Sequence, residues 1–275
     1  MTWMKKRITI VAKAYPEPSS KHGSVACTAG ITKDGEWIRL YPIDVRYFSG
    51  KKKISKYDII EVECKPDRDK LSRKESHKIR QDTISIVDKS LNVPNKDWDA
   101  RNRTILPLKV KSIEALMEAY EEDKTSIGLI RPQRLIDFIK TKELEIHEKE
   151  SWSFITTLDG EQLPRFTKID HIFKYEFRCC GCPEDKSHLM QCEDWELLES
   201  YRSWGSRYGT PEQLWSKLKA KFFGWMLGGR DLHFIMGMYS QYPTWFIIGI
   251  YYPPRNKNQS QKKQMDKPKT TLLDF

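Results

Sequence analysis

The sequence predicts an α+β protein in which a small β-barrel precedes a helix-containing region. Residues 1–90 contain short β-rich runs separated by turn residues, a pattern typical of small barrels. Four of the six cysteines gather between positions 179 and 192, which indicates a metal-binding segment. The part that follows combines two helical patterns with two apolar runs, and it ends in a polar tail.

The first half of the chain is dominated by predicted strands. The dipeptide Asp34-Gly35 is a tight-turn signal, so the strands on either side of it should form a hairpin. The expected strands cover residues 7–15, 25–32, 36–41, 58–64 and 83–87.

The middle of the chain contains one clear helix and one clear strand. Ser112 can cap a helix over residues 112–122, whose apolar side chains fall on one face. Residues 171–178 alternate between two sets of side chains, as expected of a half-buried strand.

Two helices and two strands are predicted after the cysteines. The first helix covers residues 194–204. The second begins at Thr210-Pro211-Glu212-Gln213, which supplies an N-cap, a proline at the first helical position and a capping-box glutamine. The strands cover residues 232–238 and 245–252, and the polar residues 255–270 are expected to be disordered.

The run from Val25 to Arg39 resembles the start of the dual-OB-fold module of bacterial and archaeal proteins. That module carries a Cys-x-Ala-Gly-Ile strand, a turn and a Trp-Ile-Arg strand, and all three are present here. Residues 57–60 and 73–78 resemble its later aspartate-led strand and glutamate-bearing loop. The resemblance implies an OB barrel near residues 5–90 and a second barrel near residues 105–178.

A basic surplus points to a polyanionic partner. The chain has 48 Lys and Arg against 38 Asp and Glu, which gives a net charge of +10 and a pI of about 9.2. Nucleic acid, and DNA in particular, is the expected partner, although each cluster alone also fits a solvated lysine-rich surface. The candidate phosphate contacts are Arg39, Arg46, Lys51, Lys52, Lys53, Arg68, Arg73, Lys74, Lys78 and Arg80.

The pattern Cys179-x-x-Cys182-x5-His188-x3-Cys192 has the spacing of a zinc site. Four such ligands would leave no open position for water, so the predicted zinc is structural. Cys180 is the alternative to Cys179 as a ligand. Redox chemistry at Cys179 and Cys182, or a group of free thiols, are the other interpretations.

Acidic residues near the cysteines offer a second kind of chemistry. Asp194 and Glu196 could hold Mg²⁺ for phosphodiester hydrolysis, but Asp194 also fits a helix N-cap. Asp231 and His233 form another weak catalytic candidate. A metal-dependent nuclease is therefore the enzymatic alternative.

The C-terminus resembles the PCNA-type peptide that docks on a sliding clamp. Leu272 and Phe275 occupy its aliphatic and aromatic positions, while Lys269 stands where that peptide has Gln. A flexible tail can lay such anchors into a preformed groove. A chance pattern in a disordered end is the alternative.

These features define four expected segments and one function. The segments are an OB-like barrel at 1–105, a second barrel or mixed α/β region at 106–178, a zinc-knuckle α/β domain at 179–254 and a basic tail at 255–275. Since no signal peptide or membrane-spanning run is evident, a cytoplasmic location and no membrane partner are expected. The predicted function is DNA binding as an accessory protein at replication or repair sites, with a sliding clamp as partner. A nucleotide- or protein-binding OB module in defence or signalling is the third alternative.

Overall fold

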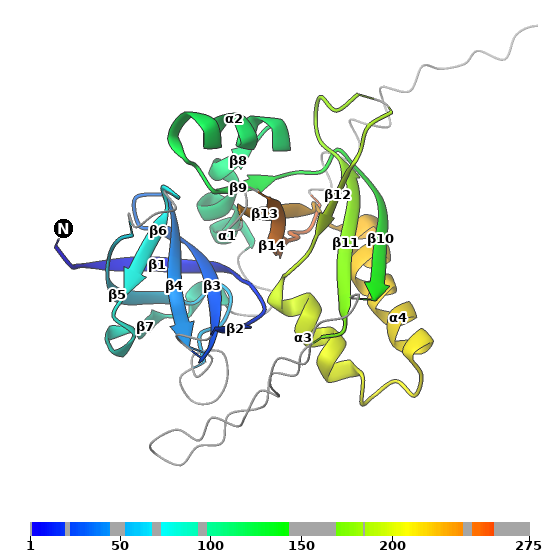
Figure 1. The fold of residues 1–275 in the computed structure, drawn as a ribbon, viewed down its shortest axis with the longest axis horizontal. Coiled ribbons are helices and arrows are strands. Elements are labelled where there is room, and N and C mark those ends of the chain that lie inside the picture. The colour runs from blue at the N-terminus through cyan, green and yellow to red at the C-terminus, as the bar shows by residue number, and fades with distance from the viewer. Residues whose placement is uncertain are drawn as a thin grey trace, which may run out of the picture.

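The computed structural model describes residues 2–19, 23–44, 53–67, 73–92, 98–142, 169–183, 185–238 and 244–255. Figure 1 shows the barrel strands on one side of the molecule and a second sheet, β10 to β12, on the other. Strands β13 and β14 lie between them, and β14 contacts β1 of the barrel and β12 of the second sheet. The mixed α+β architecture agrees with the fold class expected from the sequence.

The N-terminal barrel is closed and has five strands. Its strands follow the order β1-β3-β4-β6-β5, and β5 pairs again with β1. All pairs are antiparallel except β4 with β6. This five-stranded Greek-key barrel is OB-like. The strands are β1 (Met4–Lys13), β3 (Gly23–Thr32), β4 (Trp37–Asp44), β5 (Ile59–Pro66) and β6 (Ser76–Ile79).

Alternation along each strand fills the barrel interior. In β5 every second residue is buried, and Ile60 and Val62 point into the same core as Ile8 of β1. Gly30 of β3 allows a close approach, because a Cβ there would lie 2.3 Å from Ile8 Cγ2. Short elements complete this region: β2 (Glu17–Ser19), β7 (Ser85–Asp88), and the 3₁₀ turns Gln81–Thr83 and Ser90–Asn92.

The second unit contains two sheets and several helices. One sheet has the order β14-β13-β9-β8 and the other the order β10-β11-β12. Its strands are β8 (Lys109–Val110), β9 (Ile127–Ile130), β10 (Arg134–Lys142), β11 (His171–Arg178), β12 (His188–Gln191), β13 (His233–Met238) and β14 (Trp245–Tyr251). The helices are α1 (Trp98–Ile105), α2 (Ile113–Asp123), α3 (Trp195–Trp204), α4 (Pro211–Lys219) and α5 (Met226–Gly229), with a 3₁₀ turn at Leu106–Leu108 and a π-helical segment at Ala220–Trp225.

Helix starts follow the local signals in the sequence. The side chains of Ser112 and Thr210 each accept a backbone N–H from the first turn of the helix that they precede. Asp194 does the same for α3. Polar side chains at these positions satisfy backbone donors that a helix leaves unpaired.

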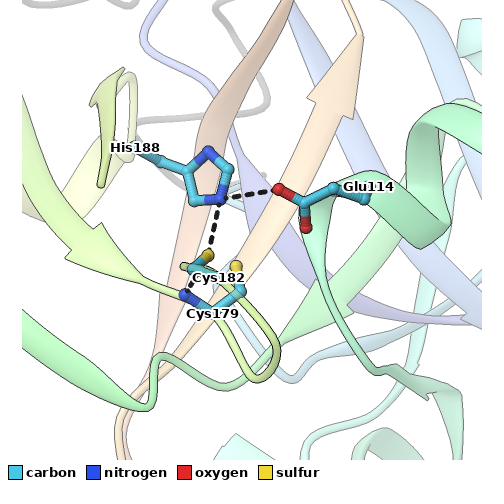
Figure 2. A group of neighbouring side chains, drawn as sticks. All are labelled: Glu114, Cys179, Cys182 and His188. Atoms are coloured by element: carbon cyan, nitrogen blue, oxygen red, sulfur yellow. Dashed lines mark hydrogen bonds and ion pairs between the residues drawn. The ribbon is translucent and has the colours of Figure 1, made fainter. Parts of the chain in front are cut away.

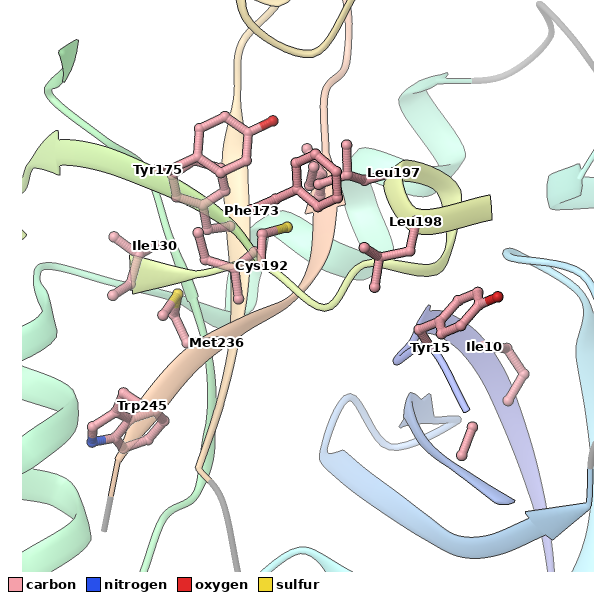
Figure 3. Packing of buried hydrophobic residues seen from close by; sticks show 14 of the residues in the cluster. Ile10, Tyr15, Ile130, Phe173, Tyr175, Cys192, Leu197, Leu198, Met236 and Trp245 are labelled. Atoms are coloured by element: carbon pink, nitrogen blue, oxygen red, sulfur yellow. The ribbon is translucent and has the colours of Figure 1, made fainter. Parts of the chain in front are cut away.

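The barrel and the second unit share one interior. The outer side of β1 and β3 packs on the β13–β14 sheet, which joins Val11, Ala12, Ala29 and Ile31 to Ile127, Leu129, Ile235, Ile248 and Tyr251. Figure 3 shows Ile10 and Tyr15 facing Leu197 and Leu198 of α3 across the same boundary. The fold is therefore a barrel fused to a second unit by apolar contacts.

The sequence also predicted a second barrel, or a mixed α/β region, at residues 106–178 and a disordered tail. The described strands between 106 and 178 are distributed over two open sheets and do not close a second barrel. The expected disordered tail lies outside the described residues from position 256 onward. Among the helices that the structure describes, none combines the length and apolar character that a membrane crossing requires.

Candidate functional site

A cluster of potential metal ligands connects α2 with the β11–β12 hairpin. Its members are Glu114, Cys179, Cys182 and His188, and their ligand atoms lie within 4.8 Å of one another (Figure 2). His188 Nε2 lies 3.2 Å from both Cys182 Sγ and Glu114 Oε1. Gly181, with φ of +93°, permits the tight turn between the two cysteines. Thiolate, imidazole and carboxylate donors in one place are a possible metal-binding site.

The local environment makes the Cys179 thiol a weak acid in the absence of a cation. Burial raises the pKa of Cys179 to about 12, and the neighbouring Cys182 and Glu114 add to this effect. A reactive redox cysteine has a depressed pKa instead, so the environment does not favour the redox interpretation. A bound cation would stabilise the thiolate.

Cys192, the fourth zinc ligand expected from the sequence, lies outside this cluster. It lies directly after β12, is 1% exposed and packs in the apolar core (Figure 3). His188 begins β12, and four residues of extended chain span about 13 Å, too far for both side chains to share one ion. Glu114 is the fourth potential ligand of the cluster. Cys180 is exposed and lies outside the cluster, so Cys179 is the better placed of the two alternatives.

No local motif in the sequence identifies Glu114 as a potential metal ligand. It occupies the first turn of α2, an element that is distant in sequence from the β11–β12 hairpin. A local motif search cannot find a ligand supplied by such a distant element.

Arg39 is buried between the barrel and the second unit. It is 2% exposed, and its guanidinium donates to the carbonyl of Ser126 at 2.9 Å and to Ser126 Oγ at 3.3 Å. The carboxylate of Glu75 accepts from the Ser126 backbone N–H and hydroxyl. Arg39 therefore joins the two units and does not face solvent.

Several other predicted phosphate contacts lie in ion pairs on the barrel surface. Lys74 pairs with Asp123, Lys78 with Asp67, and Arg80 with Glu63. Arg80 also stacks on Trp3, with 4.6 Å from its guanidinium carbon to the ring centre. Arg73 donates to the carbonyl of Met238 at 3.4 Å. Arg46, Lys51, Lys52 and Arg68 lie outside the described residues.

The acidic candidates occupy two separate environments. Asp194 accepts backbone N–H groups of Leu197 and Ile250 at 3.1 and 3.0 Å. Glu196 accepts from the Tyr252 hydroxyl and pairs with Lys221.

The other acidic candidate, at the start of β13, has different neighbours. Asp231 pairs with Arg131 at 2.5 Å. His233 is buried, and its Nδ1 lies 2.9 Å from the backbone carbonyl of Asp231. Burial lowers the pKa of His233, against the opposing influence of Asp231. Each of these groups already has a partner within the fold.

A pocket of about 270 Å³ lies where the barrel meets α3. The barrel contributes lysines and a hydroxyl, and α3 contributes its first three turns. The lining residues are Lys13, Lys53, Ser55, Lys56, Asp194, Trp195, Glu196, Glu199, Ser200 and Ser203. Of these, only Lys53 belongs to the basic residues singled out in the sequence.

Lys13 is a buried amine that lines the pocket. It is 5% exposed, donates to the carbonyl of Ile54 at 2.8 Å and lies 5.0 Å from the centre of the Trp195 ring. Burial lowers the pKa of Lys13 to about 7, and the neighbouring Lys53 contributes to the decrease.

The remaining charges of the pocket are balanced against one another. Burial lowers the pKa of Lys56, but Tyr57, Asp194 and Glu196 outweigh it and raise that pKa above its usual value. Burial raises the pKa of Asp194. Glu199 forms a two-pronged pair with Arg202.

Comparison with known proteins gives matches to two family models. Domain of unknown function DUF8758 matches residues 4–107, and domain of unknown function DUF8757 matches residues 109–269. No curated protein matches the chain.

Among solved structures, one match is titled "Structure and Conformational Change of a Replication Protein A Heterotrimer Bound to ssDNA". It has a TM-score of 0.39 and 8% identity, and it covers 96% of this chain and 52% of that chain. The chain therefore spans about half the length of that structure's matched chain.

Proposed function

We propose that this chain, which belongs to the DUF8757 family, is a nucleic-acid-binding protein. The observation that carries the proposal is a closed OB-like barrel in a chain with a net charge of +10. OB barrels commonly bind oligonucleotides and oligosaccharides. The positive charge favours the polyanion among these ligands.

The arrangement of the two units narrows where such a ligand can lie. OB domains commonly bind across their second and third strands, here β3 and β4. The side chains of Ala29 and Ile31 on this surface pack against the second unit, and Arg39 bonds to Ser126. The ligand would therefore contact another part of the barrel. The candidate phosphate contacts that stay in this proposal are Lys53, Arg46, Lys51, Lys52 and Arg68. DNA is the preferred polymer in this proposal.

Zinc is the ion that best suits the cluster at Glu114, Cys179, Cys182 and His188. Zn²⁺ accepts sulfur, imidazole and carboxylate ligands in tetrahedral sites, whereas Mg²⁺ and Ca²⁺ prefer oxygen alone. Four protein ligands would leave no coordination position open for water, so the ion would have a structural role. It would link α2 to the β11–β12 hairpin. This centre would stabilise the second unit without taking part in chemistry.

The proposal includes recruitment to replication or repair sites by a sliding-clamp peptide. It depends on Leu272 and Phe275 in the tail, which lies outside the described residues. Deletion of these last residues should abolish binding to a purified PCNA-type clamp and leave the thermal unfolding midpoint unchanged. Equal clamp binding by the full and shortened chains would remove the clamp from the proposal.

Salt-dependent binding tests the proposed function. Fluorescence anisotropy with single-stranded and duplex DNA and RNA should show affinity that falls between about 50 and 200 mM salt, because bound phosphates release counterions. Gel analysis of the end-point samples with Mg²⁺ should show intact strands. An affinity that does not change with salt, or no binding to any of the four polymers, would refute the proposal.

A further inference from the structure

We infer that Trp225 and the arginines beside it form a stacking site for an unpaired base of a single-stranded nucleic acid. The inference rests on the proposed function and deepens it, since it adds a contact surface on the second unit to those of the barrel. It is carried by an exposed indole ring, by the open space around this ring and by two neighbouring guanidinium groups.

Trp225 is a large aromatic side chain that the fold leaves at the surface. One helical stretch runs from α4 through the π-helical segment Ala220–Trp225 into α5. Its inner side is formed by buried residues at every fourth position, Leu214, Leu218, Phe222 and Met226. Trp225 is 46% exposed and ends the π-helical segment, an irregularity that is frequent at functional sites. The helix packs through other residues, so this ring is available to a ligand.

Two neighbours hold the Trp225 ring in a defined orientation. The guanidinium carbon of Arg230 lies 4.3 Å from the ring centre, which places this cation over one face of the indole. The Tyr252 ring meets the indole edge-on, with 5.8 Å between the ring centres and an interplanar angle of 72°. Tyr252 is itself fixed, because its hydroxyl donates to Glu196 at 2.8 Å. An indole that is already ordered loses little freedom when a ligand stacks on it.

The backbone around Trp225 is rich in glycine. Gly224 precedes it, and Gly228 and Gly229 follow one turn along the helix on the same side. All three glycines are exposed. A Cβ built on any of them would lie more than 4 Å from the described atoms beyond its chain neighbours and its own helix backbone. A planar base can therefore approach the indole without meeting a neighbouring side chain.

The charge beside the ring suits a polyanion. Arg255 is exposed, and its Nε donates to the backbone carbonyl of Arg230 at 2.9 Å, which keeps the two arginines together. Within the part of the chain that the structure describes, the two guanidinium groups contact the Trp225 ring and this carbonyl, not a carboxylate. Asp231, the residue after Arg230, pairs with Arg131 at 2.5 Å. The two arginines therefore keep donors for phosphate oxygens.

An exposed aromatic ring with adjacent arginines matches the repeating unit of a single strand. Each nucleotide joins a planar base to an anionic phosphate, and an unpaired base can stack on an aromatic side chain. A duplex keeps its bases stacked inside, so it offers only phosphates to this surface. Single-stranded nucleic acid is therefore the occupant that uses both the ring and the charges.

This surface borders a basic loop of the barrel. Lys56 Nζ lies 5.8 Å from the centre of the Tyr252 ring and donates to the backbone carbonyl of Ile250. Lys53, one of the candidate phosphate contacts, precedes Lys56 by three residues in the sequence. The contacts from Lys56 through Tyr252 to Trp225 therefore connect the loop that carries Lys53 with the stacking ring.

Removal of the bases separates stacking from phosphate contacts. Anisotropy titrations on the full-length protein would use a labelled single strand of about 15 nucleotides, the same strand built from abasic sugar-phosphate units, and the duplex. The variants are Trp225→Ala, Trp225→Phe and Arg255→Met. Met117→Ala, which removes an exposed apolar side chain of α2, and Arg207→Met, which removes an exposed arginine between α3 and α4, are the matched controls.

Trp225→Ala should weaken binding of the intact single strand about tenfold, whereas Trp225→Phe should keep most of the affinity because phenylalanine also stacks. Binding of the abasic strand and of the duplex should be the same in both variants as in the wild type. Arg255→Met should weaken the intact and abasic strands equally and reduce the salt slope by about 1. Both control variants should bind like the wild type.

Photo-crosslinking tests the same contact in the wild-type protein. A single strand that carries iodouracil bases would be irradiated on the protein, and the product would be digested with trypsin. The expected crosslink lies in the peptide 222–230, in which Trp225 is the only tryptophan. This measurement does not depend on the folding of any variant.

Three outcomes would overturn the inference while leaving the proposed function intact. Unchanged binding of the single strand by Trp225→Ala would show that the ring is not used. Equal losses for the intact and abasic strands would show that the ring does not act by stacking. Crosslinks confined to other peptides would place the bases elsewhere and leave the exposed ring to a protein partner. Failure of the wild type to bind any strand would instead refute the proposed function.

Discussion

Measuring the stability and the DNA binding of Arg39→Met would distinguish a structural role of Arg39 from a ligand-binding role. The sequence suggested a phosphate contact, whereas the structure places the guanidinium against Ser126 of the second unit. Methionine retains an unbranched apolar side chain, so the main loss is the two hydrogen bonds to Ser126 at 2.9 and 3.3 Å, together with a weaker one to Cys27 Sγ at 3.1 Å. A hydrogen bond to a charged group contributes about 1.5–3 kcal/mol, and the longer bond contributes less.

The expected loss is therefore about 3 kcal/mol of the free energy of unfolding. With a urea dependence of about 3 kcal/mol/M, the unfolding midpoint should fall by about 1 M. Circular dichroism and tryptophan fluorescence would follow the transition, and Lys33→Met would serve as the surface control. A midpoint that shifts by less than about 0.2 M, together with tenfold weaker DNA binding, would refute the structural role of Arg39.

Two further results are expected. Purified protein should contain about one zinc ion per chain by mass spectrometry. Cys182→Ser should lose this ion and Cys192→Ser should keep it, so zinc loss in Cys192→Ser would contradict the ligand set. Asp194→Ala should lower the free energy of unfolding by about 2–4 kcal/mol, since two buried backbone N–H groups lose their acceptor, and a urea midpoint equal to that of the wild type would argue against this role.

Local signals in the sequence predicted much of the secondary structure. Ser112, Thr210 and Asp194 cap helices as expected, and Gly35 adopts a positive φ of 81° in the predicted hairpin turn. These features depend on backbone groups within a few residues, so short patterns identify them. The OB-like character of the first region was also predicted from a run of fifteen residues.

Features that depend on contacts between residues distant in the sequence could not be predicted from local patterns. The alternation of β4 shows that Arg39 lies opposite the barrel interior, but it does not show that another sheet covers that face. Cys192 follows an extended segment that the cysteine spacing alone does not indicate. Lys13 resembles any other lysine in the sequence, and the burial that lowers its pKa becomes apparent only in the structure.

The apolar contacts between the barrel and the second unit limit how the two segments can be separated during evolution. The two family models meet between residues 107 and 109, yet the apolar contacts of Ala29 and Ile31 cross that border. Without the second unit, the barrel would expose these side chains, together with Val11 and Ala12, to water as a continuous apolar surface that favours aggregation. Gene fusion or fission at this border would therefore require compensating polar substitutions on both surfaces, so the two segments are expected to be transmitted as one unit.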